Sequence, residues 1–520
     1  MVMKYAAGGV AWICGVWSLL AAEQVWLDAG PDNVWSVSAL NWDAGAGWVN
    51  GNTARFTGAG GTQAGETVDV SGAVTVAGMT FETNGYVIAD AEADGTLTLA
   101  GGGELRVANA GDAAVVSEVV DGAGFTKTGS GRLQLSGANT FTGVVRIAEG
   151  TLRLSKWNPT VLGAAGSGNG TVVESGATLD IYGAFTNNLN RAEDLALAGA
   201  GVDGQGALIN TGTGCMNSGF SGTTTLLGDT TIGCFSRIDF RGNVAGGRHT
   251  LTKIGNSELA VGVQVNNCPI EINAGNYTHM NALALGGADF DTTLNGGALR
   301  SYSTQTVTEH LICNGGIVRT TGTTAEGNGV RLGHYPQTRS FYNMMGGTLI
   351  VEQDYDLGCA TDGHGWFNMT GGEVFAKRVM LNERTGGGGY GRLTVAGGTL
   401  NLGSLTGSDM AISNGIAVDA GGPYLVELGG AGGTIRAVTN VTVFLDAALN
   451  GVGAEAIHFD PAGWEITVSG NLSGDGGLNK TGAGTLTLSG NNTYAGPTRV
   501  LQGRLVRGVY AALPDMGEVL

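Results

Sequence analysis

Proline and charge are both scarce in this sequence of 520 residues. Proline occurs 8 times, too rarely for collagen, and the glycines keep no three-residue period. Charged residues make up 13% of the chain, about half the usual share. Lys and Arg number 26 against 44 Asp and Glu, a net charge of −18. Because nucleic-acid binding needs a basic surface, we expect no nucleic-acid partner.

Cysteines are also few, and no Cys-x-x-Cys pair occurs. The six are Cys14, Cys215, Cys234, Cys268, Cys313 and Cys359. Their wide spacing and the scattered histidines lack the signature of a zinc site or of a disulfide scaffold. We therefore expect no metal and no cofactor, and we interpret the five cysteines after Cys14, which lies in the predicted export signal described below, as small buried core residues. A bridge between Cys215 and Cys234 stays open.

Glycine, in contrast, is abundant. The chain contains 95 glycines, while apolar residues make up 42% of it. At each helix-interior position glycine costs roughly 0.5–1 kcal/mol, so this density excludes a helical bundle. The apolar content is nevertheless high enough for a large buried core. The composition thus favours an all-β fold.

The first residues have the pattern of an export signal. Lys4 supplies a positive charge, residues 11–20 are mainly apolar, and Ala21 and Ala22 precede Glu23 as a small-residue cleavage site. A single membrane anchor is the alternative, but the apolar run is shorter than the ~20 residues that a bilayer requires. We predict a signal peptide over residues 1–22 and a mature chain without a membrane-spanning segment.

Two distant passages are nearly identical. Residues 127–143 read KTGSGRLQLSGANTFTG, and residues 480–496 read KTGAGTLTLSGNNTYAG. With their flanks they define repeats at 123–154 and 476–507, and a degenerate copy lies at 249–275. Lys127, Lys253 and Lys480 hold the same place in the three copies, which indicates a structural role and not that of catalytic bases.

A second pattern is Gly-Gly followed by a small or polar residue and an aliphatic one. It occurs at residues 296–299, 315–318, 346–349, 371–374, 397–400 and 432–435. Apolar and polar residues alternate around these sites, which is typical of short half-buried strands, and glycine permits sharp corners between them. A turn–strand unit repeated every ~20–30 residues predicts a solenoid over 111–520. Several β-sandwiches in series are the alternative.

Two further features complete this prediction. Asn139 and Asn492 occupy equivalent corners of the two clear repeats, where stacked asparagines could form amide ladders. Residues 23–110 form a Trp-rich N-terminal region with Trp26, Trp35, Trp42 and Trp48. We interpret this region as a β cap that covers the end of the first coil. A platform on which sugar rings stack is the alternative.

The repeated phrase resembles the autotransporter-associated β-strand repeat, also called the passenger-associated transport repeat. The Trp-rich opening and residues 199–210, GAGVDGQGALIN, are similar to such passengers as well. The resemblance implies a right-handed parallel β-helix, pectin-lyase-like in architecture, displayed on or released from the outer membrane of a Gram-negative-type cell. In some members the repeat is thought to assist passage across that membrane.

Autotransporters of that family end in a membrane β-barrel, whereas this sequence ends at Leu520 shortly after a repeat. Two expectations remain open. Either the sequence is a fragment of a longer anchored protein, or another chain supplies the cap and the anchor.

Parallel β-helices also host polysaccharide lyases and glycosidases, which need clustered or facing carboxylates. The acidic clusters are Asp90, Glu92 and Asp94; Asp289 and Asp291; and Glu352, Asp354 and Asp356 with Asp362 and His364. On one strand Glu352, Asp354 and Asp356 would share a face. The same alternation is equally typical of a solvated strand face, so we assign no catalytic, cofactor-binding or metal-binding residue.

The leading functional hypothesis is therefore an exported, non-catalytic passenger-like protein at the cell surface or in the medium. It would act in adhesion and surface contact or assist translocation, with a surface polysaccharide or an outer-membrane component as partner. A polysaccharide-acting β-helix lyase or glycosidase is the alternative.

Overall fold

The structure is a computed structural model. It describes residues 21–514 except for 28–31, 59–65, 156, 186–190, 214–218, 263–264, 280–289, 302–304, 308–309, 321–329, 333–338, 358–362, 382–388, 404–414, 419–422 and 445. Almost all of the predicted signal peptide lies outside these residues.

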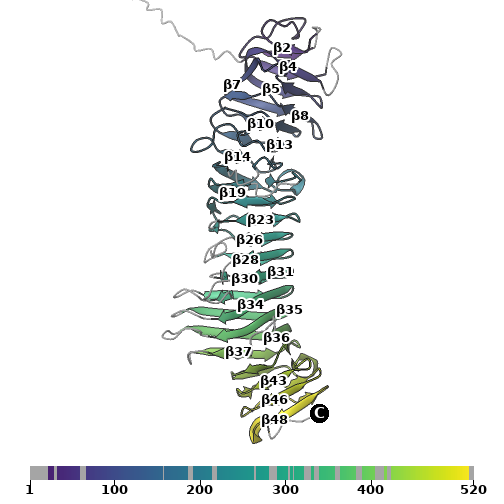
Figure 1. The fold of residues 1–520 in the computed structure, drawn as a ribbon, viewed down its shortest axis with the longest axis vertical. Coiled ribbons are helices and arrows are strands. Elements are labelled where there is room, and N and C mark those ends of the chain that lie inside the picture. Colours follow the sequence, from purple (N-terminus) through teal and green to yellow (C-terminus); the bar gives the residue numbers. More distant parts are fainter. Residues whose placement is uncertain are drawn as a thin grey trace, which may run out of the picture.

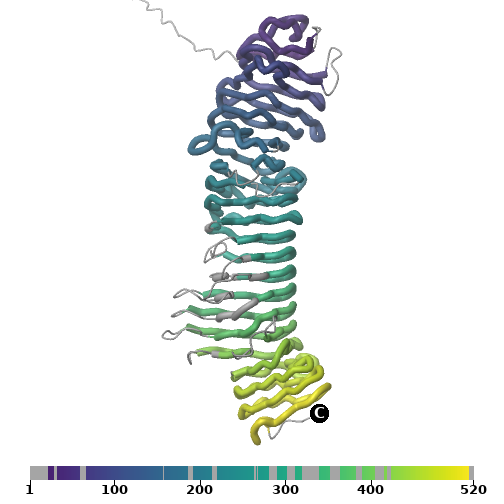
Figure 2. The backbone as a smooth tube through the Cα atoms, in the orientation of Figure 1, coloured from purple at the N-terminus to yellow at the C-terminus, as the bar shows by residue number. Residues whose placement is uncertain are grey.

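The chain coils into an elongated stack of strands. The 48 strands of the described residues belong to one parallel sheet, which runs from β1 (Glu23–Trp26) to β48 (Arg504–Arg507). Successive coils lie one above another along the long axis, from the purple end to the yellow end (Figures 1 and 2). The helical elements in the described part of the chain are three short 3-10 turns, η2 (Val202–Gly204), η3 (Gly453–Glu455) and η4 (Tyr510–Ala512). The predicted all-β solenoid is confirmed, while its hand stays a prediction.

Equivalent residues of neighbouring coils lie directly opposite each other. One continuous series of strands is β30 (His310–Cys313), β33 (Arg339–Met344), β35 (His364–Leu381), β36 (Tyr390–Leu402) and β38 (Tyr424–Gly429). Within it Leu311, Tyr342, Phe367, Leu393 and Val426 pair in register, and all are buried. Because in-register parallel pairing places like faces together, the apolar residues form a column inside the coil.

The Gly-Gly pairs make the corners of the coils, as predicted. Gly347 and Gly372 have φ angles of 75° and 76°, in the left-handed region. A Cβ atom on Gly372 would lie 2.7 Å from the carbonyl oxygen of Gly347 in the preceding coil. Both the backbone conformation and the close approach therefore require glycine.

The Trp-rich region fills the end of the first coils with aromatic rings. Trp26, Trp35 and Trp42 are fully buried and Trp48 is 3% exposed. The rings of Trp42 and Trp48 lie 4.6 Å apart, and Trp26 meets Trp42 edge-on at 5.2 Å. Antiparallel bridges join Trp42 to Trp26 and to Ala46. Buried rings offer no face to a sugar, which favours the cap; its boundary at residue 110 stays a prediction.

The predicted amide ladder is wrong for Asn139 and Asn492. Asn139 Oδ1 accepts the N–H of Val120 at 2.9 Å, and its Nδ2 donates to the carbonyl of Val161 at 2.7 Å. Asn492 makes the equivalent two bonds at 2.8 and 2.6 Å. Each asparagine thus bridges the backbones of the coils on either side, because a buried amide satisfies two backbone groups there.

An amide ladder does exist elsewhere, just before the Gly-Gly corners. Asn295 Nδ2 donates to Asn273 Oδ1 at 2.8 Å, and Asn314 Nδ2 donates to Asn295 Oδ1 at 2.8 Å. The ladder therefore stabilises exposed corners of the middle coils, while the repeat asparagines act inside.

Candidate functional site

The three repeat lysines lie inside the coil. Lys127 in β10 (Thr126–Thr128), Lys253 in β22 (Leu251–Ile254) and Lys480 in β45 (Leu478–Lys480) are all fully buried. Each lysine pairs with apolar residues of the preceding and the following coil. Lys127 pairs with Leu105 and Ile147, Lys253 with Ile232 and Ile272, and Lys480 with Phe459 and Val500. Each lysine stem thus occupies a place in an apolar column.

The ammonium groups are held by backbone carbonyls. Lys127 Nζ donates to the carbonyls of Thr128 and Gly129 at 2.8 Å each, and to that of Glu149 in the next coil at 2.9 Å. Lys253 and Lys480 make the same three bonds at 2.7–3.1 Å. Burial lowers the pKa of Lys127 to about 7. We call this arrangement the lysine lock: its three donors are used to join two coils.

The first acidic cluster closes a turn. Asp90 accepts the N–H groups of Asp94 and Gly95 at 3.1 and 2.9 Å, and Asp94 accepts the hydroxyl of Ser71 at 3.1 Å. Glu92 is exposed. Glu118, which no sequence pattern indicated, is 4% exposed; burial, and after it the charge of Asp90, raises the pKa of its carboxyl to about 7.

Most of the remaining acidic candidates fall beyond what the structure describes. Asp289, Asp362 and the side chains of Glu352, Asp354 and Asp356 lie outside the described residues. The backbone of β34 (Thr348–Leu357) pairs Asp354 with Arg378 after a register shift that follows Val351.

Two members of these groups, Asp291 and His364, lie within the described residues. Asp291 begins β27 (Asp291–Leu294) and is exposed. His364 packs beside Trp366, with ring centroids 5.5 Å apart. Among the described residues, no three His, Cys, Asp or Glu side chains are placed to hold a metal ion.

The described cysteines are core residues, as predicted. Cys234, Cys268 and Cys313 are buried free thiols. Burial raises their pKa values to about 12, 12 and 11. Cys215 and Cys359 lie outside the described residues, so a bridge between Cys215 and Cys234 stays untested.

One buried histidine leads to a pH prediction. His279 ends β26 (Asn276–His279) and is 3% exposed, and neither ring nitrogen has a hydrogen-bond partner among the described residues. Burial lowers its pKa from 6.5 to about 4. Because the unfolded state then binds the extra proton, the free energy of unfolding should fall as the pH drops from 6.5 to 4, by about 3 kcal/mol in full.

Denaturant unfolding of the wild type and of His279→Phe at pH 7 and pH 4 measures this effect. The difference between the two proteins isolates His279 from the carboxylates, which titrate in both. Equal pH dependence in both would contradict the assignment.

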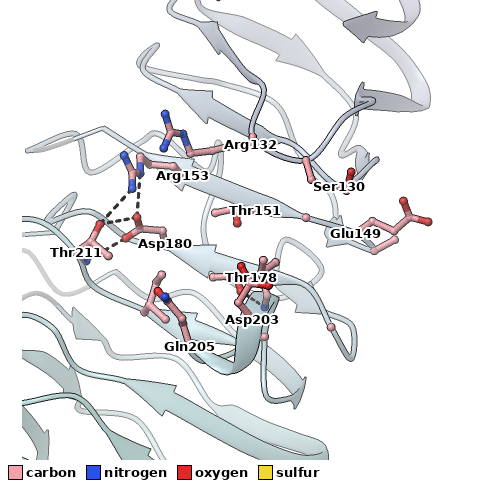
Figure 3. A pocket seen from close by; sticks show the side chains of 18 of the residues that line it. Ser130, Arg132, Glu149, Thr151, Arg153, Thr178, Asp180, Asp203, Gln205 and Thr211 are labelled. Carbon is pink, nitrogen blue, oxygen red and sulfur yellow. Dashed lines mark hydrogen bonds and ion pairs between the residues drawn. The ribbon is translucent and has the colours of Figure 1, made fainter. Parts of the chain in front are cut away.

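A polar groove runs along one corner of several successive coils. It has a volume of about 780 Å³ and is lined by the ends of β11 (Arg132–Leu135), β13 (Thr151–Leu154) and β15 (Thr178–Asp180), and by the turn η2. Figure 3 shows Arg132 and Arg153 side by side, with Asp203 and Gln205 on the adjoining turn. This volume lies within the range of ligand-binding pockets.

On one side of the groove, hydrogen bonds within the protein hold the side chains in place. Asp180 is buried and accepts four hydrogen bonds: from Arg153 Nε at 2.9 Å, from Thr211 Oγ1 at 2.6 Å, and from the backbone N–H groups of Thr211 and Tyr182 at 3.1 Å each. The guanidinium of Arg153 also lies 4.6 Å from the ring centroid of Tyr182. These groups fix the wall of the groove and leave Asp180 no capacity for a further strong bond.

Four other polar side chains of the groove have hydrogen-bonding capacity left for a ligand. Arg132 is half-buried, and its Nε atom has no hydrogen-bond partner within the residues that the structure describes. Burial, and after it the charge of Arg153, lowers the pKa of Arg132. The side chains of Thr151, Asp203 and Gln205 also line the groove; within the described part of the chain they make no hydrogen bond. Together they offer donors and acceptors to a polar ligand.

Comparison with known proteins agrees with the repeats. The family model of the passenger-associated-transport-repeat matches residues 125–154 and 478–506. The chain is 28% identical over 519 residues to a Brucella suis biovar 1 (strain 1330) protein named Adhesin BmaC autotransporter. That match covers 93% of this chain and 14% of the relative's length.

A second relative is matched over a short stretch. An extracellular serine protease of Serratia marcescens is 68% identical over 37 residues, which are 7% of this chain and 4% of that protein. No solved structure matches the chain. Two segments of this parallel β-solenoid are thus passenger-associated transport repeats, and most of the chain is similar to an autotransporter adhesin.

Proposed function

We propose that this chain is an exported, non-catalytic surface passenger that makes adhesive contact with polysaccharide through the groove. The observation that carries this proposal is the groove itself, which offers free donors and acceptors along the corners of several coils. A chain of sugars has many hydroxyl groups in a row, and such a row fits a groove that spans several coils and is lined by polar side chains. The similarity to an autotransporter adhesin supports the adhesive role.

Export is the second part of the proposal. Residues 1–22 would direct the chain out of the cytoplasm and be removed, leaving Glu23 as the first residue. The transport repeats support a location at or beyond the outer membrane. In the described part of the chain, no helix is long and apolar enough to span a membrane.

The arrangement of acids supports a binding role over hydrolysis. Glycosidases use two carboxylates that face each other across the bond to be broken. In the groove, Asp180 is saturated with hydrogen bonds, and Glu149 accepts the N–H of Gly129 at 3.0 Å. Asp112 also lines the groove and accepts the side-chain amide of Asn109 at 3.0 Å, so Asp203 is the one carboxylate of the groove without a hydrogen bond among the described residues.

A blocked groove tests the proposal. Ala110 is exposed and lines the groove, so Ala110→Trp should fill it; Ala165 is exposed and lies outside the lining, so Ala165→Trp is the matched control. We expect the purified chain and the control to bind polysaccharides on a saccharide array, with at least a tenfold weaker signal for Ala110→Trp. Polymer length after incubation, measured by size-exclusion chromatography, should not change.

Equal binding by the two tryptophan variants would remove the groove from the proposal. Shortening of a bound polymer would favour the enzyme alternative. Retention of the chain inside native cells, shown by fractionation and immunoblotting, would contradict surface display.

A second function, assistance in translocation, is favoured by the lysine locks. Each lock joins the coil that contains the lysine to the coil that follows it in the chain. Coils that lock in sequence outside the cell would resist sliding back. The surface yield of a chain without locks is the measurement that tests this role.

A further inference from the structure

We propose that the groove selects saccharides that carry an anionic group, a carboxylate or a sulfate, which binds at Arg132. This inference rests on the proposed function and adds the charge of the ligand to it. Arg132 would bind the anion with its planar set of donors, and Thr151, Asp203 and Gln205 would bind hydroxyl groups of the same chain.

Arg132 and Arg153 occur in the first repeat but not at the equivalent positions of the second repeat. In the phrase Gly-x-Leu-x-Leu the leucines point inward, and Arg132 holds the first variable position, which points outward. The equivalent residue of the second repeat is Thr485, and the equivalent of Arg153 is Val506. The solenoid therefore does not require these two arginines, and both belong to the groove of the first repeat alone.

Arg132 has no direct ion-pair partner in the described part of the chain, although the charge of nearby Asp180, which is bound to Arg153, acts on it. Arg153 is paired with Asp180 at 2.9 Å. Arg132 has lost part of its water, because it is half-buried and its Nε atom is covered. A partly desolvated charge that forms no direct ion pair is costly, and an anion bound at Arg132 would offset that cost.

Other acids that line the groove form no ion pair with Arg132 in the described part of the chain. Glu149 accepts the N–H of Gly129 at 3.0 Å, and Asp112 accepts the side-chain amide of Asn109 at 3.0 Å. Asp203 lies on the turn η2, beside Gln205 and at the other side of the groove from Arg132 (Figure 3). The positive position at Arg132 and the acceptor groups at η2 would therefore orient a sugar chain that bears one charge and several hydroxyls.

Three sets of oligosaccharides of one stereochemistry test this inference: galacturonate oligomers, neutral galactose oligomers and sulfated galactose oligomers. We expect the full chain to bind a charged set at least tenfold more tightly than the neutral set by titration calorimetry, with affinity that weakens as salt is raised. Arg132→Gln should lose this preference, and Arg132→Lys should recover part of it.

Arg146→Gln is the matched control, because Arg146 is also a repeat-strand arginine but pairs with Glu174 outside the groove. Its affinity should equal that of the wild type. Preference for the carboxylated or for the sulfated set would identify which anion the site takes.

Equal affinity for charged and neutral oligomers, or no effect of Arg132→Gln, would overturn the inference and leave the groove as a neutral saccharide site. If no oligomer or polysaccharide of any class bound to the wild type, both the inference and the proposed function would fail.

Discussion

Replacing Lys127 by Met is expected to destabilise its coil and the next one by about 3 kcal/mol. Methionine keeps the apolar stem but removes the ammonium, so the carbonyls of Thr128, Gly129 and Glu149 lose their donor. A buried unsatisfied polar group costs roughly 1–3 kcal/mol. Methionine also avoids the desolvation that lowers the pKa of Lys127 to about 7, but three orphaned carbonyls outweigh that gain.

Hydrogen exchange is the suitable measurement, because coils of a solenoid contact only their neighbours and open locally. Peptides that cover residues 120–154 should exchange faster in Lys127→Met, while peptides beyond residue 420 stay unchanged. Arg146→Met, a substitution of an exposed arginine on the next coil, is the control and should have little effect.

Unchanged protection in Lys127→Met would mean that water satisfies these carbonyls. The double variant Lys127→Met, Lys480→Met extends the test to translocation: a reduced surface yield with normal synthesis is expected if the locks hold emerging coils.

Replacing Trp42 by Ala is expected to cost 3–5 kcal/mol and to open the N-terminal end. Trp42 is fully buried and contacts the rings of Trp26, Trp35, Trp48 and Phe56 at 4.6–5.8 Å. Removal of such a ring from a packed core leaves a cavity, which adds to the lost transfer energy. The uncovered edges of the strands in the first coil should then pair with other molecules.

Hydrogen exchange over residues 23–56 and static light scattering measure the two consequences. Trp157→Ala is the matched control, since Trp157 is 69% exposed and packs against little. An intact, monomeric Trp42→Ala chain would contradict the role of the Trp-rich region as a cap.

The solenoid could be predicted because its signals are local and repeated. Gly347 and Gly372 mark corners where only glycine fits, and Leu393 and Val395 alternate with polar residues as a half-buried strand does. Each repeat shows the same pattern of corner and strand residues, so a wrong assignment at one corner does not change the prediction for the other coils. The structural role of Lys127, Lys253 and Lys480 followed from the same repetition.

Contacts between different coils could not be predicted in this way. The groove joins residues from 110 to 211, and their distances depend on the length of each coil. Likewise, Arg191 and Glu193 form a buried pair at 2.7 Å, in which Arg191 also donates to the carbonyls of Leu162 and Gly163 in a distant loop. No local pattern distinguishes this pair from a solvated Arg and Glu on a strand.

The direction of the bonds between coils has a mechanical consequence. In a stack of parallel strands the backbone hydrogen bonds run along the long axis, so a pull on the two ends loads them directly. Coils should then peel away one at a time, each lengthening the chain by a single turn. A locked coil adds one ammonium bond to the next coil, and the same ammonium is held by two carbonyls of its own coil, so peeling should pause there. The rod would extend under tension in steps and so absorb work before a bound surface is released.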